Sequence, residues 1–295
     1  MQTRLVLARL SVFLAVFSWA TNWIVGRAMR TELGPVTMGF WRWTIALIII
    51  LPFCLSEITL KWSEIKIMKW RLATLGLLGA VAFNTFLYVG LQFTQASNAS
   101  LLNTTIPTFI MLITFLAYRE PIQRLQIVGL LISSVGVGFI IFRGDFSLLA
   151  KFSLNRGDVW VLAAMVLVST YTVLLRSWTT TLSPLTFLAT ILIFSIPILT
   201  PFYIWELLSQ GGFDLSRETL MTLIYYGTIP SILGYLLWNY GVDVLGPIKA
   251  GMFVHLMPVL TIGLSVLLLN ESLYAYHGVG ALLIFLGISC ANRHQ

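Results

Sequence analysis

Long apolar runs follow one another along almost the whole chain, separated by short segments that contain charge, Gly or Pro. A hydrocarbon core of about 30 Å needs roughly 20 apolar residues for one helical crossing. In lipid, backbone groups must hydrogen-bond within the spanning segment, which requires helices here. The sequence therefore predicts an all-α membrane protein with ten transmembrane helices, at about 9–28, 36–55, 71–92, 97–118, 124–142, 158–176, 184–204, 219–241, 248–269 and 274–292.

The distribution of charge excludes several other classes of protein. Only 10% of the residues are charged, whereas a soluble domain has about 25%, so most of the surface is expected to contact membrane lipids. The net charge of +7 comes from short loops and forms no basic stripe, so no nucleic-acid partner is expected. Cys54 and Cys290 are far from any metal-ligand spacing. We therefore expect no metal, no cofactor and no catalytic residue.

Lys and Arg residues are unevenly divided between alternate loops. The side that contains both termini has more of them, concentrated in an expected loop between Glu57 and Arg71. Cytoplasmic loops retain positive charge. We therefore expect an integral protein of a bacterial-type inner (plasma) membrane with N- and C-termini in the cytoplasm.

The chain also repeats itself. A shift of 151 residues superposes seven pairs of identical residues, and a shift of 149 residues extends the match to the first two helices of each half. The first set is Gly76/Gly227, Gly90/Gly241, Ala99/Ala250, Pro107/Pro258, Glu120/Glu271, Gly129/Gly280 and Gly136/Gly287, and the second is Arg27/Arg176, Pro35/Pro184 and Pro52/Pro201. We expect two five-helix repeats, at residues 1–145 and 155–295.

An odd number of crossings in each repeat inverts the second copy in the membrane. Inverted repeats let inward-open and outward-open states be near mirror forms of similar energy around a midplane site. This symmetry favours a transporter, because an enzyme or an anchor has no need of it.

Several short motifs, in a fixed order, resemble those of the EamA family of the drug/metabolite transporter superfamily. Residues 19–23 are similar to the family's Trp-Gly-x-Asn-aromatic opening, with Ala20 in place of the usual glycine, and residues 40–43 occupy the place of its Leu-Arg-Phe. Its third-to-fourth-helix signature is matched by residues 88–94, 96–102, 106–107 and 119–121, and again by residues 235–238, 245–247, 257–258 and 270–273. The resemblance covers nearly the whole chain and implies a ten-helix transporter with a central substrate cavity.

The resemblance does not identify the cargo. No nucleotide-binding P-loop is present, so we expect a secondary transporter of a small-molecule substrate, with proton coupling or exchange. Export is favoured, and an amino acid or related amphipathic compound is the favoured cargo. A flippase for lipids or lipid-linked sugars on the same fold is an alternative. A membrane-embedded enzyme is a remote one, because His255, His277 and His294 are widely dispersed.

Polar side chains inside the predicted spans are costly in lipid, so they should face the bundle interior. The shift of 151 residues aligns Asn84 and Tyr88 with Tyr235 and Asn239. Such recurrence favours a shared cavity, with hydrogen bonds that only hold the bundle together as the alternative. The predicted substrate-binding residues are Asn22, Asn84, Tyr88, Asn103, Thr104, Tyr171, Tyr235, Trp238, Asn239 and His255.

Two prolines within spans predict helix kinks. Pro107 and Pro258 each free a carbonyl about one turn upstream, where Asn103, Thr104 and His255 lie. If protons drive transport, His255 is the candidate carrier, because histidine titrates near neutral pH. A hydrogen-bonded structural histidine is the favoured interpretation.

Three further features have two interpretations each. Arg42 could bind an anionic cargo group, but its place near a helix end favours a side chain that snorkels to the interface. Glu120 and Glu271 are interpreted as caps of the following helices rather than gates. Small residues on the fifth and tenth helices favour close packing within the chain over a homodimer: Gly129, Ser133, Gly136, Gly280 and Gly287.

Overall fold

A computed structural model describes residues 2–29, 33–94, 96–145, 147, 155–178, 180–269 and 272–292. Nine helical segments in these ranges are long and apolar enough to cross a membrane, and the shorter apolar helix Ala275–Ala291 follows them. The molecule is therefore an all-α membrane protein with ten crossings, as the hydropathy pattern predicts.

The first half contains α1 (Gln2–Met29), α2 (Pro35–Leu60), α3 (Trp62–Gly76), the π-helical stretch η1 (Leu77–Ala82), α4 (Phe83–Leu91), α5 (Ala96–Asn103), α6 (Ile106–Tyr118) and α7 (Arg124–Ile141). The second half contains α8 (Arg156–Ser177), α9 (Pro184–Gln210), α10 (Arg217–Tyr226), the π-helical stretch η3 (Gly227–Leu233), α11 (Gly234–Leu245), α12 (Pro247–Gly251), the 3₁₀ turn η4 (Met252–His255), α13 (Leu256–Leu269) and α14 (Ala275–Ala291).

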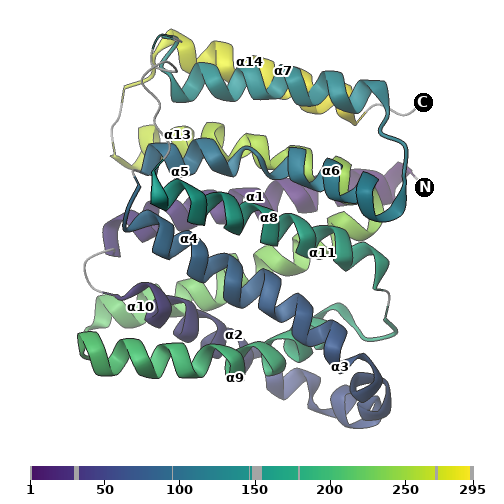
Figure 1. Ribbon diagram of the computed structural model, residues 1–295, viewed down its shortest axis with the longest axis vertical. Helices are drawn as coiled ribbons and strands as arrows, with labels where there is room; N and C mark the ends of the chain where they lie inside the picture. The colour runs from purple at the N-terminus through teal and green to yellow at the C-terminus, as the bar shows by residue number, and fades with distance from the viewer. Residues whose placement is uncertain are drawn as a thin grey trace.

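The helices lie side by side with their axes roughly parallel to one another (Figure 1). The pair α7 and α14 lies at one end of the long axis of the molecule, and α2 and α9 lie toward the other end. Helices α1, α4, α8 and α11 occupy the region between these pairs. The start of α1 and the end of α14 lie on the same side of the bundle.

One predicted loop proves to be helical. The hydropathy pattern predicts a loop between Glu57 and Arg71, but α2 continues to Leu60 and α3 begins at Trp62. Similarly, α1 begins at Gln2 rather than near residue 9. Hydropathy detects only the part of a helix that lies in lipid, and charged residues can extend a helix beyond the hydrocarbon region. The basic residues of this segment therefore lie on helix ends rather than on a loop.

Glycines allow α7 and α14 to pack closely. A Cβ atom on Gly129 would collide with the backbone carbonyl of Gly287, and one on Gly136 would lie 2.7 Å from the carbonyl oxygen of Gly280. Each contact therefore requires a residue without a side chain. The small residues of these two helices pack against each other within the chain, as the sequence interpretation favours.

Two glutamates connect α2 and α9 at opposite ends of this antiparallel pair. Oε1 and Oε2 of Glu206, on α9, accept hydrogen bonds from the backbone amides of Val36 (3.1 Å) and Thr37 (2.6 Å) at the start of α2. Near the end of α2, Glu57 accepts bonds from the Ser183 amide (2.9 Å) and hydroxyl (2.6 Å) at the start of α9. Each carboxylate thus binds the positive end of the other helix.

Candidate functional site

Two π-helical stretches interrupt equivalent helices near their middles. The shift of 151 residues places Gly79 of η1 on Pro230 of η3. A π turn disturbs the regular ladder of backbone hydrogen bonds and is frequent at functional sites, and Pro230 has no N–H to donate. Both stretches therefore present carbonyl oxygens to side chains from other helices.

These carbonyls accept hydrogen bonds from aromatic side chains. The Tyr235 hydroxyl donates to the Gly79 carbonyl (2.7 Å), Trp43 Nε1 donates to the Ala80 carbonyl (3.0 Å), and Trp19 Nε1 donates to the Pro230 carbonyl (3.1 Å). Asn84 Nδ2 also donates to the Ala80 carbonyl, at 3.0 Å. Side chains from α1, α2 and α11 are thus held against the two helix breaks.

The aromatic rings contact one another to form what we call the central aromatic cluster: Trp19, Trp43, Tyr171, Tyr235 and Trp238. The Tyr235 ring centroid lies 5.0 Å from that of Trp43, and 6.0 Å from those of Trp19 and Tyr171. The Trp238 and Trp19 centroids are 5.2 Å apart. Because these residues lie on α1, α2, α8 and α11, both halves of the chain contribute to the cluster.

Several predicted site residues meet at this cluster. Tyr171, Tyr235 and Trp238 belong to it, and the Tyr171 hydroxyl lies 3.1 Å from Asn239 Oδ1. The other amide atom, Asn239 Nδ2, is buried and has no hydrogen-bond partner among the described residues. A buried donor without a partner costs free energy. A ligand that accepts a hydrogen bond from Asn239 Nδ2 would remove this cost.

Two other predicted residues, on α1 and α4, have different neighbours. Asn22 follows Trp19 on α1, and its Oδ1 is buried without a hydrogen-bond partner within the described parts of the chain. Tyr88 on α4 packs against the small apolar cluster that contains Tyr226 and Met38. Gln92, one helical turn beyond Tyr88, is exposed at the end of α4.

The remaining predicted residues form a separate group at the second pair of broken helices. The 3₁₀ turn η4 ends at His255, whose Nδ1 lies 2.7 Å from Ser133 Oγ and whose Nε2 lies 2.9 Å from the Thr104 carbonyl oxygen. Asn103 Nδ2 lies 3.5 Å from Met257 Sδ. These contacts join α5 and the turn that follows it to η4, α7 and α13, and none of them involves a residue of the central aromatic cluster.

The helix breaks in this group lie beside the two prolines. Helix α5 ends at Asn103 and α6 begins at Ile106, immediately before Pro107. In the second half, α13 begins at Leu256, two residues before Pro258. A cavity of about 150 Å³ adjoins this group and is lined by Asn103, Pro258 and neighbouring apolar side chains. A few water molecules would fill it.

Arg42 departs from its favoured sequence interpretation. Its side chain does not snorkel to the interface: the residue is 4% exposed, and Nε donates to Ser231 Oγ at 2.5 Å. Nη2 lies 3.3 Å from the Pro230 carbonyl oxygen, and the guanidinium lies over the Trp43 ring at 4.8 Å. Inward burial of a charged residue within a span marks functional sites. Arg42 therefore points inward toward the Pro230 carbonyl of η3, a contact that the local sequence around Arg42 does not contain.

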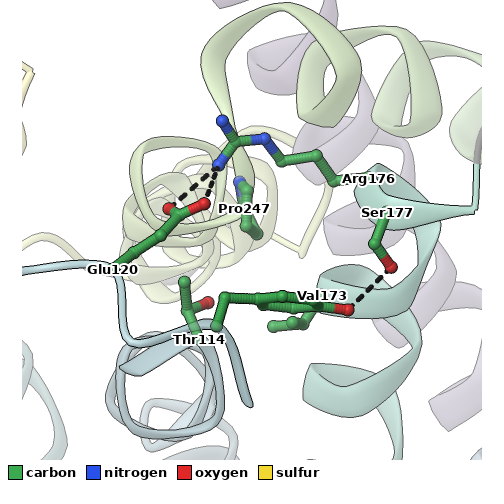
Figure 2. A pocket seen from close by; sticks show the side chains of 7 residues that line it. Thr114, Glu120, Val173, Arg176, Ser177 and Pro247 are labelled. Atoms are coloured by element: carbon green, nitrogen blue, oxygen red, sulfur yellow. Dashed lines mark hydrogen bonds and ion pairs between the residues drawn. The ribbon is translucent and has the colours of Figure 1, made fainter. Parts of the chain in front are cut away.

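A second cavity lies at the side of the molecule that contains the start of α1. It has a volume of about 140 Å³ and is lined by Thr114, Tyr118, Glu120 and Arg176, among others. Figure 2 shows Glu120 facing Arg176, whose Nη1 lies 3.1 Å from Glu120 Oε2. This pair closes one edge of the cavity.

The expected helix cap at Glu120 is wrong. Gln123 is the N-cap of α7 and forms a capping box with Gln126, so the backbone amides at this helix end have a nearer partner. Glu120 instead pairs with Arg176 across the cavity. The corresponding prediction for Glu271 falls outside the described residues. No group of three or more His, Cys, Asp or Glu side chains that could hold a metal ion occurs among the described residues.

Comparison with known proteins gives concordant matches. The model of the EamA-like transporter family matches residues 6–142 and 155–293. The uncharacterized transporter YyaM of Bacillus subtilis (strain 168) is 24% identical over 262 residues, covering 88% of this chain and 84% of that protein. An uncharacterized transporter of Archaeoglobus fulgidus is 25% identical over 293 residues, 96% of each chain.

A solved crystal structure shares the fold. It superposes with a TM-score of 0.78 and covers 96% of this chain and 96% of its own, at 16% sequence identity. At that identity the likeness concerns the arrangement of helices and carries no information about cargo.

Proposed function

This chain belongs to the EamA-like transporter family, and from that membership we propose that it is a secondary transporter that exports a small organic metabolite. An amino acid or a related amphipathic compound is the favoured cargo. The proposed binding region is the central aromatic cluster, together with Asn22, Asn84, Tyr88 and Asn239.

The observation that supports this proposal most directly is the composition of the cluster. Its side chains come from both halves of the chain and are held by carbonyls of two equivalent helix breaks. In transporters built from inverted repeats, the substrate binds at the repeat interface near interrupted helices. Tyr and Trp rings offer apolar faces together with polar groups at their edges, which suits an amphipathic cargo.

Alternating access would act on this cluster. In the present conformation its side chains are packed against one another, and neither cavity described above is lined by them. Cargo entry therefore requires the two halves to move apart on one side. Rocking of one half against the other exposes the cluster first to one side of the membrane and then to the other.

We further propose the cytoplasm for both termini and the bacterial-type inner (plasma) membrane as location. The side with the start of α1 and the end of α14 also has the junction of α2 and α3 (Figure 1), and the sequence at this junction includes Lys61 and Lys66. Retention of positive charge on the cytoplasmic side supports this orientation.

The test is ligand binding followed by exchange. Purified protein is heated with a panel of amino acids, amines, nucleosides and sugars, because a ligand bound only to the folded state stabilises it by about 3 kcal/mol at 100 times Kd. Each stabilising compound is then measured in counterflow across proteoliposomes. We expect at least one compound both to stabilise the protein and to exchange.

Two variants provide the site control. Asn239→Ala removes a buried amide beside Tyr171 and should abolish the stabilisation, while Gln92→Ala at an exposed helix end should leave it unchanged. Stabilisation by phospholipids alone, with no exchange of any soluble compound, would contradict the proposal and favour a flippase.

A further inference from the structure

The structure contains a buried positive charge that no carboxylate of the described chain neutralises. This charge is on Arg42. The ion pairs among the described residues join Arg4 to Asp243, Lys61 to Glu57, and Arg176 to Glu120. Arg42 is more deeply buried than these three cations, yet its protein acceptors are the neutral Ser231 hydroxyl and Pro230 carbonyl. A buried cation is costly unless it is paired.

From this geometry we infer that Arg42 and Tyr226 form a binding site for a carboxylate group of the cargo. The inference rests on the proposed transport function and narrows its substrate class to organic anions and zwitterions that contain a carboxylate.

The guanidinium has donors to spare. A guanidinium has five N–H donors arranged as a planar fork, and the described acceptors engage Nε and Nη2 only. No described residue accepts a hydrogen bond from Nη1. A carboxylate matches the fork geometry and can bind two of these donors at once. The guanidinium also lies over the Trp43 ring, with Cζ 4.8 Å from the ring centroid.

A second donor without a partner lies in the same region. The Tyr226 hydroxyl is buried and has no hydrogen-bond partner among the described residues, and the residue is 1% exposed. Tyr226 is linked to Arg42 through Ser231, whose Oγ accepts from Arg42 Nε and donates to the Tyr226 carbonyl. Leaving a buried hydroxyl unpaired costs free energy. One oxyanion would satisfy both the charge and the hydroxyl.

The elements involved connect this site to the transport cycle. Arg42 lies on α2 in the first half, while its two acceptors, Pro230 and Ser231, lie on η3 in the second half. Ser231 Oγ in turn donates to the Tyr226 carbonyl at 2.6 Å. When the halves separate, Arg42 loses its acceptors on η3, and the carboxylate of the cargo replaces them.

The site has no copy in the other repeat. The shift of 149 residues places Ile191 at the position equivalent to Arg42. An anionic group therefore binds on one side of the pseudo-symmetric centre, and the apolar part of the cargo lies toward the central aromatic cluster. This arrangement also orients the cargo.

The experiment compares carboxylates with their amides in neutral phosphatidylcholine proteoliposomes. The probe pairs are L-phenylalanine with L-phenylalaninamide, phenylacetate with phenylacetamide, and succinate with succinamide. We expect one or more carboxylates to bind and exchange at least ten-fold better than the matched amide. Arg42→Gln should remove this preference, and Arg217→Gln, an exposed control, should retain it.

Tyr226→Phe provides a second test that does not depend on the folding of Arg42→Gln. Loss of a hydrogen bond to a charged group costs about 1.5–3 kcal/mol, so we expect carboxylate affinity to fall at least ten-fold with little change for the amides. Equal binding of acid and amide by the wild type, or an acid preference that survives in Arg42→Gln, would overturn the inference.

The outcomes separate the two proposals. Exchange of amides or amines without carboxylates would overturn the anion site and leave the transport function intact. Exchange of no soluble probe, with stabilisation by phospholipid only, would overturn both.

Discussion

The two halves build the same connection between α2 and α9 with different chemistry. Glu57 and Glu206 are equivalent under the shift of 149 residues, as are Gly34 and Ser183 at the starts of the helices that they bind. Ser183 caps α9 with its own hydroxyl, which accepts from the Thr186 amide. Gly34 has no side chain to cap α2. The amides at the start of α2 are therefore capped by the Glu206 carboxylate from α9.

The surroundings of the two carboxylates differ accordingly. The Glu57 side chain is 24% exposed and also binds Lys61 at 2.8 Å. Glu206 is 3% exposed, and among the described residues its carboxylate binds only backbone amides. Repeat symmetry thus preserves the position of the contact between α2 and α9. The start of α9 is capped by its own residue Ser183, whereas the start of α2 is capped by Glu206 from another helix.

The helix breaks differ in the same way. Thr104 and His255 are equivalent under the shift of 151 residues, and they contact each other through the His255 ring and the Thr104 carbonyl. Arg42 is opposed by Ile191 in the other half. The scaffold is therefore shared between halves, whereas Arg42 and His255 have no charged or histidine counterpart at the equivalent position of the other half.

The largest expected effect comes from breaking the Glu206 contact. Glu206→Ala leaves the buried amides of Val36 and Thr37 without acceptors, which costs about 1–2 kcal/mol for each amide. We therefore expect the free energy of unfolding to fall by about 2–4 kcal/mol. Glu57→Ala should cost about 1 kcal/mol or less, because Ser183 still caps α9 and water can reach the site. Reversible unfolding in detergent measures both.

Asp214→Ala, in an exposed segment, is the control for removal of an acidic group. Equal losses in Glu206→Ala and Glu57→Ala would show that burial does not distinguish the two contacts.

The next effect concerns the glycine contacts of α7 and α14. Gly129→Ala would place a Cβ against the Gly287 carbonyl and force the helices apart, at about 1–3 kcal/mol for overpacking. Gly278→Ala on α14 meets nothing within 4 Å and should stabilise by about 0.5–1 kcal/mol, because alanine favours the helix. The same unfolding experiment applies, and destabilisation by both substitutions would contradict the packing described.

The smallest effect compares a central tyrosine with a peripheral one. Tyr235→Phe removes the donor to the freed Gly79 carbonyl and should cost about 1 kcal/mol. Tyr118→Phe removes an exposed bond to Ser177 and should have no measurable effect on thermal unfolding. If Tyr235→Phe leaves thermal unfolding unchanged, the hydrogen bond from Tyr235 to the Gly79 carbonyl does not stabilise the fold.

Much of the architecture follows from the sequence by itself. Ten crossings, two repeats and the inverted relation between them follow from apolar run length and from the two shifts. These properties are local or periodic, because lipid requires each crossing to satisfy its own backbone. Tyr171, Tyr235 and Asn239 contact one another in the structure, and the substrate-binding role expected for them stays a prediction.

Only the tertiary structure decided which way Arg42 points, which carboxylate caps α2, and that Asn103, Thr104 and His255 lie apart from the aromatic cluster. Each of these depends on contacts between residues far apart in the chain, such as Arg42 with Ser231 or Val36 with Glu206. Hydropathy gives the same value to a buried cation and to one that snorkels. The direction of such a side chain is decided by a partner that local pattern does not contain, here a carbonyl freed by a π turn on another helix.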